Sequence, residues 1–228
     1  MTTLEQFAEL ARTLHSQPDA EHTLDQVVQA AVDLIPHCEV AGLSLTEKPH
    51  SITSAAATSP LATRSVEIQH ETGDGPCVEA AYDHPVIYVP NLRIESRWPL
   101  WAVQLLSEGH HVASVMCLQL FTNENRLGAL SLYASRQSAF DAEDVDVAII
   151  LSAQAAVAFA AAAKVSQLGQ ALGTRTVIGQ AMGLLMHEFQ LSAEQSFSAL
   201  TQLSGSQDRK LVDVARAMVA DWESTVHH

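Results

Sequence analysis

Apolar residues recur at helical spacing near the N-terminus. Their pattern predicts a short helix over residues 4–14 and a second helix over residues 23–35, which Pro36 ends. Thr23 and Gln26 stand at the spacing of a capping box, so we expect Thr23 to begin the second helix. The chain is therefore expected to open with two helices.

Several shorter runs, bounded by turn residues, are typical of strands. They cover residues 39–46, 51–58, 86–89, 112–121 and 126–134. The last two form the clearest hairpin, around Asn123, Glu124 and Asn125, and we expect them to be central strands.

The chain between Leu61 and Gly109 has an irregular pattern. Apart from the strand at 86–89, it contains a turn at residues 73–77 and a helix over residues 98–107. Irregular chain beside a sheet is where ligand pockets tend to form, so we place a pocket in this segment.

A long helix follows the hairpin. Asp141 is expected to cap it together with Asp144, and Phe140 with Val145 to form a hydrophobic staple. An apolar seam then alternates steps of four and three residues, as in a coiled coil, and indicates pairing with a second copy. The alternative is a helix that lies on its own sheet. The seam comprises Val147, Leu151, Gln154, Ala158, Ala161, Val165, Leu168 and Leu172.

The remaining chain is predicted to be helical after a break near residues 169–174. Helices are expected over 175–189, 193–203 and 208–222, the second capped by Ser192 and Gln195. The fold class is therefore α+β. An N-terminal domain, residues 1–163, has an antiparallel sheet flanked by helices, and a long coiled-coil helix joins it to an all-α three-helix bundle, residues 164–228.

Charge is distributed unevenly along the 228 residues. The formal net charge of -14 argues against a nucleic-acid partner for the chain as a whole. Residues 1–163 hold seven Lys and Arg against 20 Asp and Glu, whereas residues 164–228 hold five against six. The nearly neutral C-terminal part, with its bases grouped at Arg175, Arg209, Lys210 and Arg216, therefore stays a candidate for nucleic-acid binding.

The sequence shows no secretion signal and no run of about 18 uninterrupted apolar residues, so we expect a cytoplasmic protein with no membrane partner. The three cysteines, Cys38, Cys77 and Cys117, are odd in number and far apart along the chain. That argues against a disulfide framework and against a zinc site, and reduced thiols are expected.

Residues 73–80 (GDGPCVEA) and 140–144 (FDAED), together with the order of elements over residues 1–163, resemble the GAF domain, a small-ligand sensor. The resemblance implies a small-molecule ligand, whose identity and cofactor requirement are unknown. Polar tips and flat rings in the irregular segment are the candidate ligand-binding residues. They are Cys77, Tyr82, His84, Trp98, Trp101, His110 and His111.

Each of these residues also has a simpler interpretation. The two tryptophans suit core packing, and a His-His pair suits a solvated turn better than a haem or metal site. Cys77 follows Pro76 at the expected start of a short helix, where the helix dipole would favour a reactive thiolate. A structural cysteine is the alternative.

Three segments resemble the ANTAR domain: residues 175–186 (RTVIGQAMGLLM), 191–197 (LSAEQSF) and 209–215 (RKLVDVA). The resemblance implies a homodimer whose paired ANTAR domains hold two RNA hairpin loops in a nascent transcript and so prevent termination. This sequence departs from the family pattern at Met182, where many members carry Lys. The candidate RNA-binding residues are Arg175, Gly179, Gln180, Ala181, Gly183, Met186, Arg209 and Lys210.

The residues themselves favour the same interpretation. Two glycines within a helix each cost roughly 1 kcal/mol relative to alanine, so a compensating contact is expected, either RNA or tight helix packing. Arg209 and Lys210 are expected in the first turn of the last helix, where N–H groups attract phosphate. We expect Arg175, Gly183, Arg209 and Lys210 to share one RNA-facing surface.

The function predicted is a transcription antitermination regulator and not an enzyme. Two alternatives stay open at this point. Some GAF proteins reduce free methionine sulfoxide with cysteines, although the cysteine spacing here does not obviously match. The last three helices could also be a helix-turn-helix DNA binder, although none is dense in Arg, Asn and Gln.

Overall fold

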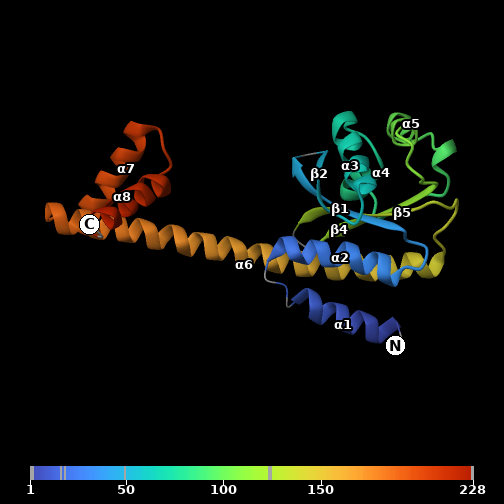
Figure 1. Cartoon of the computed structure of the whole chain (residues 1–228), viewed down its shortest axis with the longest axis horizontal. Coiled ribbons are helices and arrows are strands. Elements are labelled where there is room, and N and C mark those ends of the chain that lie inside the picture. The colour runs from blue at the N-terminus through green and yellow to red at the C-terminus, as the bar shows by residue number, and fades with distance from the viewer. Residues whose placement is uncertain (1–2, 16, 18, 49, 123–124, 227–228) are drawn as a thin grey trace. The chain divides into compact units, whose positions relative to one another are not determined.

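The computed structural model describes residues 3–15, 17, 19–48, 50–122 and 125–226. Its backbone contacts form two compact units, Met1–Ala163 and Lys164–His228, which we treat separately. Helix α6 (Ala142–Phe189) begins in the first unit and ends in the second (Figure 1).

The first unit is built on a five-stranded antiparallel sheet in the order β2-β1-β5-β4-β3. Its strands are β1 (Val40–Lys48), β2 (Ser51–Ala57), β3 (Val86–Val89), β4 (Ser114–Phe121) and β5 (Arg126–Ala134). All five predicted strands are confirmed, and the β4–β5 hairpin lies inside the sheet as expected. Asn123 and Glu124, predicted in its turn, lie outside the described residues.

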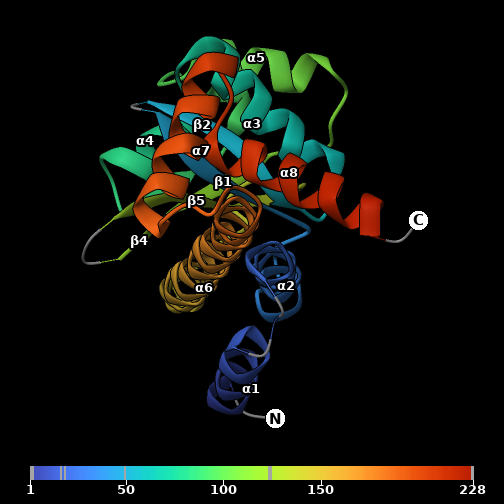
Figure 2. The ribbon, with the colours of Figure 1, turned by 90° about the vertical axis from the view of Figure 1, so that its left-hand side faces the viewer.

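Helices cover both faces of the sheet. Helices α2 (Ala20–Leu34) and α6 lie on one face, while α3 (Pro60–Thr72), α4 (Pro76–Tyr82) and α5 (Pro99–Ser107) lie on the other (Figures 1 and 2). The first unit also contains α1 (Thr3–His15) and the short η1 (Leu92–Ile94). Together these elements confirm the predicted α+β class with an antiparallel sheet flanked by helices.

Alternation along β4 and β5 divides the interior into two cores. Met116, Leu118, Leu130 and Leu132 pack toward α2 and α6. Their sequence neighbours, including Cys117, Ala129 and Tyr133, pack toward α3, α4 and α5. Successive side chains of a strand point to opposite faces, so two buried faces require buried residues at nearly every position.

The predicted cap of α2 at Thr23 is wrong. Asp19 caps the helix, because its side chain accepts a hydrogen bond from the backbone N–H of His22 at 2.9 Å. The Thr23 hydroxyl lies one turn inside and donates to the Asp19 carbonyl oxygen at 2.8 Å. Asp19 directly precedes the first helical residue, Ala20, and an aspartate at that position is itself a strong N-cap signal.

The segment after β2 is helical rather than irregular. Ser59 caps α3 and Pro60 occupies its first turn, which is a strong start signal. The inward face of α3 carries the buried polar residues Ser65 and Gln69, which interrupt the apolar stripe by which a helix is recognised. The interruption explains why helical periodicity did not reveal this helix.

Helix α6 begins as predicted. Asp141 Oδ1 accepts hydrogen bonds from the N–H groups of Glu143 and Asp144, and Asp144 Oδ2 accepts one from the N–H of Asp141. The predicted break near residues 169–174 is wrong, because α6 is continuous to Phe189. Gly169 and Gly173 weaken a helix without forbidding it, and no proline follows them.

The predicted seam of α6 has two parts with different surroundings. Val147 and Leu151 are buried in the core of the first unit. Val165, Leu168 and Leu172 are 58–69% exposed. The early part of the seam therefore lies on its own sheet, and the later part has no such cover within the described chain. By length and composition α6 could also cross a membrane, which is weak evidence because core helices of soluble proteins pass the same test.

The second unit combines the end of α6 with α7 (Ala193–Gln207) and α8 (Leu211–Val226). The predicted capping box of Ser192 and Gln195 is confirmed. Asp208 ends α7 in the left-handed conformation, and the Lys210 carbonyl accepts the first hydrogen bonds of α8. Arg209 and Lys210 thus precede α8 instead of forming its first turn. The buried apolar core of the described residues consists of Ala181, Leu185, Leu200, Val214 and Ala215.

Candidate sensor site and RNA interface

A buried polar cluster lies between the sheet and helices α3 and α4 of the first unit. Gly75, at φ 152°, allows the chain to turn from α3 into α4, and a Cβ there would collide with the Gln69 side chain. Gln69 therefore reaches the start of α4, where its Oε1 accepts the Cys77 N–H at 2.7 Å. The glycine explains why residues 73–77 form this turn.

Cys77 is the centre of the cluster. Its Sγ lies 3.1 Å from Gln69 Nε2, 3.0 Å from Ser131 Oγ and 3.6 Å from Cys117 Sγ. Hydrogen bonds from Cys117, Ser131 and Gln69 lower the pKa of Cys77 against the opposing effect of burial. Burial, and then the neighbouring Cys77, raise the pKa of Cys117 well above its ordinary value.

The cluster extends to two aromatic residues. Trp101 Nε1 donates to Ser65 Oγ at 3.0 Å. Tyr133 is 1% exposed, and its hydroxyl lies beside Ser65, Ser131 and Cys77 but makes no hydrogen bond of good geometry among the described residues. Buried polar groups are normally paired, so an unpaired hydroxyl marks a position where a polar ligand atom or a water molecule would be stabilised.

The predicted ligand residues do not line one cavity. Cys77, Trp98 and Trp101 are at most 3% exposed and pack in the core. Tyr82 is half-buried, and its hydroxyl donates to the Lys48 carbonyl oxygen at 2.7 Å. The exposed His84 lies 3.4 Å from Glu79. For the tryptophans the core-packing interpretation fits.

His110 and His111 lie on the loop between α5 and β4, apart from the cluster around Cys77. His110 Nε2 is 3.6 Å from Glu108, and His111 is exposed. Sequence reasoning missed Ser65, Gln69, Ser131 and Tyr133, which surround Cys77. The alternation of side chains along β5 could have shown that Ser131 and Tyr133 share one face of the sheet. The Ser59-Pro60 pair could have shown where α3 begins.

A second polar group lies at the start of α6. His37, Asp141 and Asp144 have ligand atoms within 4.8 Å of one another. His37 Nδ1 is 2.8 Å from Asp144 Oδ2, and both carboxylates accept backbone hydrogen bonds of the helix start. These hydrogen bonds give the group a structural explanation.

In the second unit, one face of α6 carries half of the predicted RNA-binding residues. Arg175, Gly179, Gly183 and Met186 are exposed and follow one another at steps of three or four residues, so they share a face. We call these four residues the glycine stripe. A Cβ added at Gly179 or Gly183 would meet no atom within 4 Å. The two glycines are therefore not explained by packing within the described chain.

The other predicted RNA-binding residues lie elsewhere. Ala181 is fully buried against α7 and α8, so its side chain cannot contact RNA. Gln180 is exposed beside the stripe. Arg209 bonds Gln207 Oε1 and the Asp213 carbonyl oxygen. The expected single surface is thus divided into the glycine stripe and a separate turn that carries Arg209 and Lys210, which we call the basic turn.

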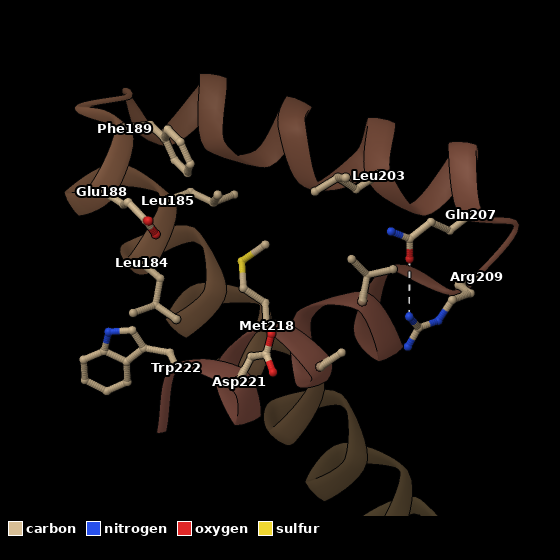
Figure 3. Close-up of a pocket in the computed structure, with 12 residues that line it drawn as sticks. Leu184, Leu185, Glu188, Phe189, Leu203, Gln207, Arg209, Met218, Asp221 and Trp222 are labelled. Carbon is tan, nitrogen blue, oxygen red and sulfur yellow. Dashed lines mark hydrogen bonds between the residues drawn. The ribbon is translucent and has the colours of Figure 1, made fainter. Parts of the chain in front are cut away.

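Arg209 lines a groove of about 660 Å³ between the end of α6, α7 and α8 (Figure 3). Leu184, on the flank of α6 away from the stripe, also lines it. Exposed aromatic side chains stand at its edge, since Phe189 is 60% and Trp222 50% exposed. Glu188 and Asp221 add carboxylates to the same lining, so the groove is mixed in charge.

A helix-covered antiparallel sheet with a buried polar cluster, followed by a small helical unit, fits a regulator with a sensor and an output domain. The chain belongs to the GAF domain family, whose model matches residues 17–160. The ANTAR domain model matches residues 166–219. The predicted family resemblance is thereby confirmed for both parts of the chain.

Solved structures share the fold of the first unit. The GAF domain of an Acinetobacter phosphoenolpyruvate-protein phosphotransferase matches 73% of this chain and 99% of its own, with 14% identity and a TM-score of 0.56. Free methionine-R-sulfoxide reductase from Neisseria meningitidis matches 72% of this chain and 91% of its own, with 13% identity and a TM-score of 0.56. At these identities the likeness shows the fold alone. No curated protein matches the sequence.

Proposed function

We propose that the protein is a cytoplasmic, homodimeric transcription antitermination regulator. Its ANTAR domains bind paired RNA hairpin loops, and its GAF domain controls them in response to a small molecule of unidentified structure. The observation that carries the proposal is the exposed glycine stripe within a domain that matches the ANTAR family. The GAF domain acts as a sensor and not as an enzyme.

The glycine stripe suits close approach by RNA. Two helical glycines cost roughly 2 kcal/mol relative to alanine, and nothing in the described chain occupies the space they leave open. An unpaired base or a sugar–phosphate segment would lie directly against the helix backbone there. Arg175 at one end of the stripe supplies a phosphate contact. Lys210 and the N–H groups at the start of α8 supply another.

The exposed part of the α6 seam, Val165, Leu168 and Leu172, supports the homodimer. The glycine stripe continues the same helix face, so a second copy and RNA could compete for it. In a parallel pair the two Arg175 side chains would repel each other. Gly179 and Met182 follow at seam spacing, but Gly179 has no side chain and Met182 packs against the core of its own unit. Pairing therefore ends near Leu172, and the glycine stripe stays open for RNA.

Binding of designed RNAs by the full chain tests the proposal. A two-hairpin RNA should bind much more tightly than either hairpin alone, because the second contact is intramolecular. The double variant Arg209→Ala, Lys210→Ala should weaken binding to every hairpin and flatten its salt dependence. Tighter binding of duplex DNA than of RNA would favour the helix-turn-helix alternative instead.

One observation favours a second candidate function. The Cys77 and Cys117 sulfurs lie 3.6 Å apart, in a fold shared with a free methionine-R-sulfoxide reductase. If the protein reduced free methionine sulfoxide, the product methionine would accumulate in the presence of a thiol reductant. We expect no turnover above that of a Cys77→Ala, Cys117→Ala variant.

A further inference from the structure

Two of the three cysteines lie close together although 40 residues separate them in the sequence. Cys77 comes from the first turn of α4 and Cys117 from the middle of β4. Their sulfurs are 3.6 Å apart, and both side chains are at most 1% exposed. A disulfide bond has an S–S length of about 2.05 Å, so a relative movement of about 1.5 Å would join them.

The surroundings make the two thiols unequal. The Cys77 sulfur accepts a hydrogen bond from Gln69 Nε2 and shares another with Ser131 Oγ, and the Gln69 side chain also accepts the Cys77 backbone N–H. Hydrogen bonds with Cys117, Ser131 and Gln69 lower the pKa of Cys77, whereas burial raises the pKa of Cys117. A thiolate next to a neutral thiol is the arrangement in which one sulfur attacks an oxidant and the other resolves the product.

Cys38 provides a contrast within the same domain. It lies in the other core, and its thiol donates to the Val40 carbonyl oxygen at 3.4 Å. Burial raises its pKa to about 12. A buried cysteine whose pKa is raised in this way is expected to be inert, so Cys38 is an internal control.

We propose that Cys77 and Cys117 form a dithiol pair that a hydroperoxide oxidises to an intramolecular disulfide. The Cys77 thiolate attacks the peroxide O–O bond, which gives the Cys77 sulfenic acid and a hydroxide or alkoxide that takes up a proton. The Cys117 sulfur then attacks the Cys77 sulfur. The S–S bond forms, and the sulfenic oxygen leaves as water with the Cys117 proton, so two electrons pass from the two sulfurs to the peroxide.

The burial of both sulfurs restricts the oxidant to a small molecule. Hydrogen peroxide can reach Cys77 with a small displacement of the seven-residue helix α4, whereas oxidised glutathione is too large. The product would tie α4 to β4 and break the contact between the Cys77 sulfur and Gln69. Oxidation would thus change the position of the helix that covers the buried polar cluster, independently of whether the second unit binds RNA.

The experiment is cysteine mapping of the full chain after exposure to hydrogen peroxide. Reduced protein is treated with one equivalent, alkylated under denaturing conditions and digested for mass spectrometry. We expect two of the three thiols to be lost, the peptides of Cys77 and Cys117 to be linked, and Cys38 to be alkylated. Oxidised glutathione at the same concentration should leave all three thiols free.

Variants provide the controls. Cys38→Ser should form the disulfide at the wild-type rate, and Cys117→Ala should stop at the sulfenic acid, which dimedone captures on Cys77. Three alkylated thiols, a disulfide that includes Cys38, or a link between two chains would overturn the proposal. The wild-type mapping stands by itself if a variant does not fold. None of these outcomes depends on RNA, so they are separable from a failure of the proposed function.

Discussion

The two units of the chain are stabilised to very different extents by their own interiors. The first has a sheet covered on both faces, with two extensive cores that include Trp101, Leu118 and Leu130. Five buried residues form the core of the second, and exposed apolar side chains such as Phe189 and Trp222 surround it. A small helical unit of this kind is marginal by itself.

This difference in burial indicates which unit can hold a polar site in its interior and which presents its sites on the surface. The first unit can keep a polar cluster around Cys77 in its interior because extensive apolar burial offsets the cost. The second unit leaves its glycine stripe and basic turn on the surface. The contacts with a second copy and with RNA that we propose would therefore add a large fraction of its stability, since ligand binding stabilises a folded state by mass action.

The same substitution in the two cores should have unequal consequences. Leu130→Ala and Leu200→Ala each remove a fully buried leucine, at a cost of about 2–5 kcal/mol. The first unit should tolerate this loss, whereas α7 and α8 should unfold. Hydrogen exchange followed by mass spectrometry reads both units in one sample. Equal protection of α7 and α8 in Leu200→Ala and wild type would show that the second unit is more stable than its core suggests.

Removal of the exposed seam should separate the two copies without unfolding either unit. Leu168→Glu with Leu172→Glu places like charges in the proposed interface, and light scattering should then report monomers. Val103→Glu, on the exposed side of α5, replaces an apolar residue of 67% exposure and should leave the dimer intact. If the seam variant kept the molecular mass of the wild-type protein in solution, the α6 seam would be excluded as the dimer contact.

The smallest effect concerns the helix caps. Ser192→Ala removes the confirmed cap of α7 and should cost about 1 kcal/mol, mostly in the second unit. Asp141→Ala removes the corresponding cap of α6 within the better stabilised unit. In thermal unfolding, Ser192→Ala should lower the temperature of the first transition more than Asp141→Ala does. If the two variants lowered the temperature of the first unfolding transition equally, the proposed difference in stability between the units would be wrong.

Local signals in the sequence predicted much of the fold. Short runs bounded by turn residues located all five strands, and the caps at Asp141 and Ser192 were predicted correctly because each depends on a few adjacent residues. Helix α3 was missed because Ser65 and Gln69 interrupt its apolar face. The continuity of α6 through Gly169 and Gly173 was missed because glycine lowers helix stability without specifying an end.

The candidate sites were harder to predict, since they depend on contacts between distant segments. The distance between Cys77 and Cys117 follows from the packing of α4 on β4, which their spacing in the sequence does not reveal. Helical spacing did place Gly179 and Gly183 correctly on the surface. It could not show that Arg209 lies beside Gln207 and on another side of α6, because that position depends on how α7 and α8 pack.

Gly183→Leu is the decisive variant for the proposed contact between the glycine stripe and RNA. Leucine favours the helix, and a Cβ at this position meets no atom of the described chain within 4 Å, so the protein should stay folded and dimeric. Gly205→Leu adds the same side chain to open space on α7 and serves as the control. Binding of a two-hairpin RNA should weaken at least ~10-fold for Gly183→Leu, a loss of about 1.4 kcal/mol, and stay at the wild-type value for Gly205→Leu. Wild-type affinity in a folded, dimeric Gly183→Leu variant would contradict the account.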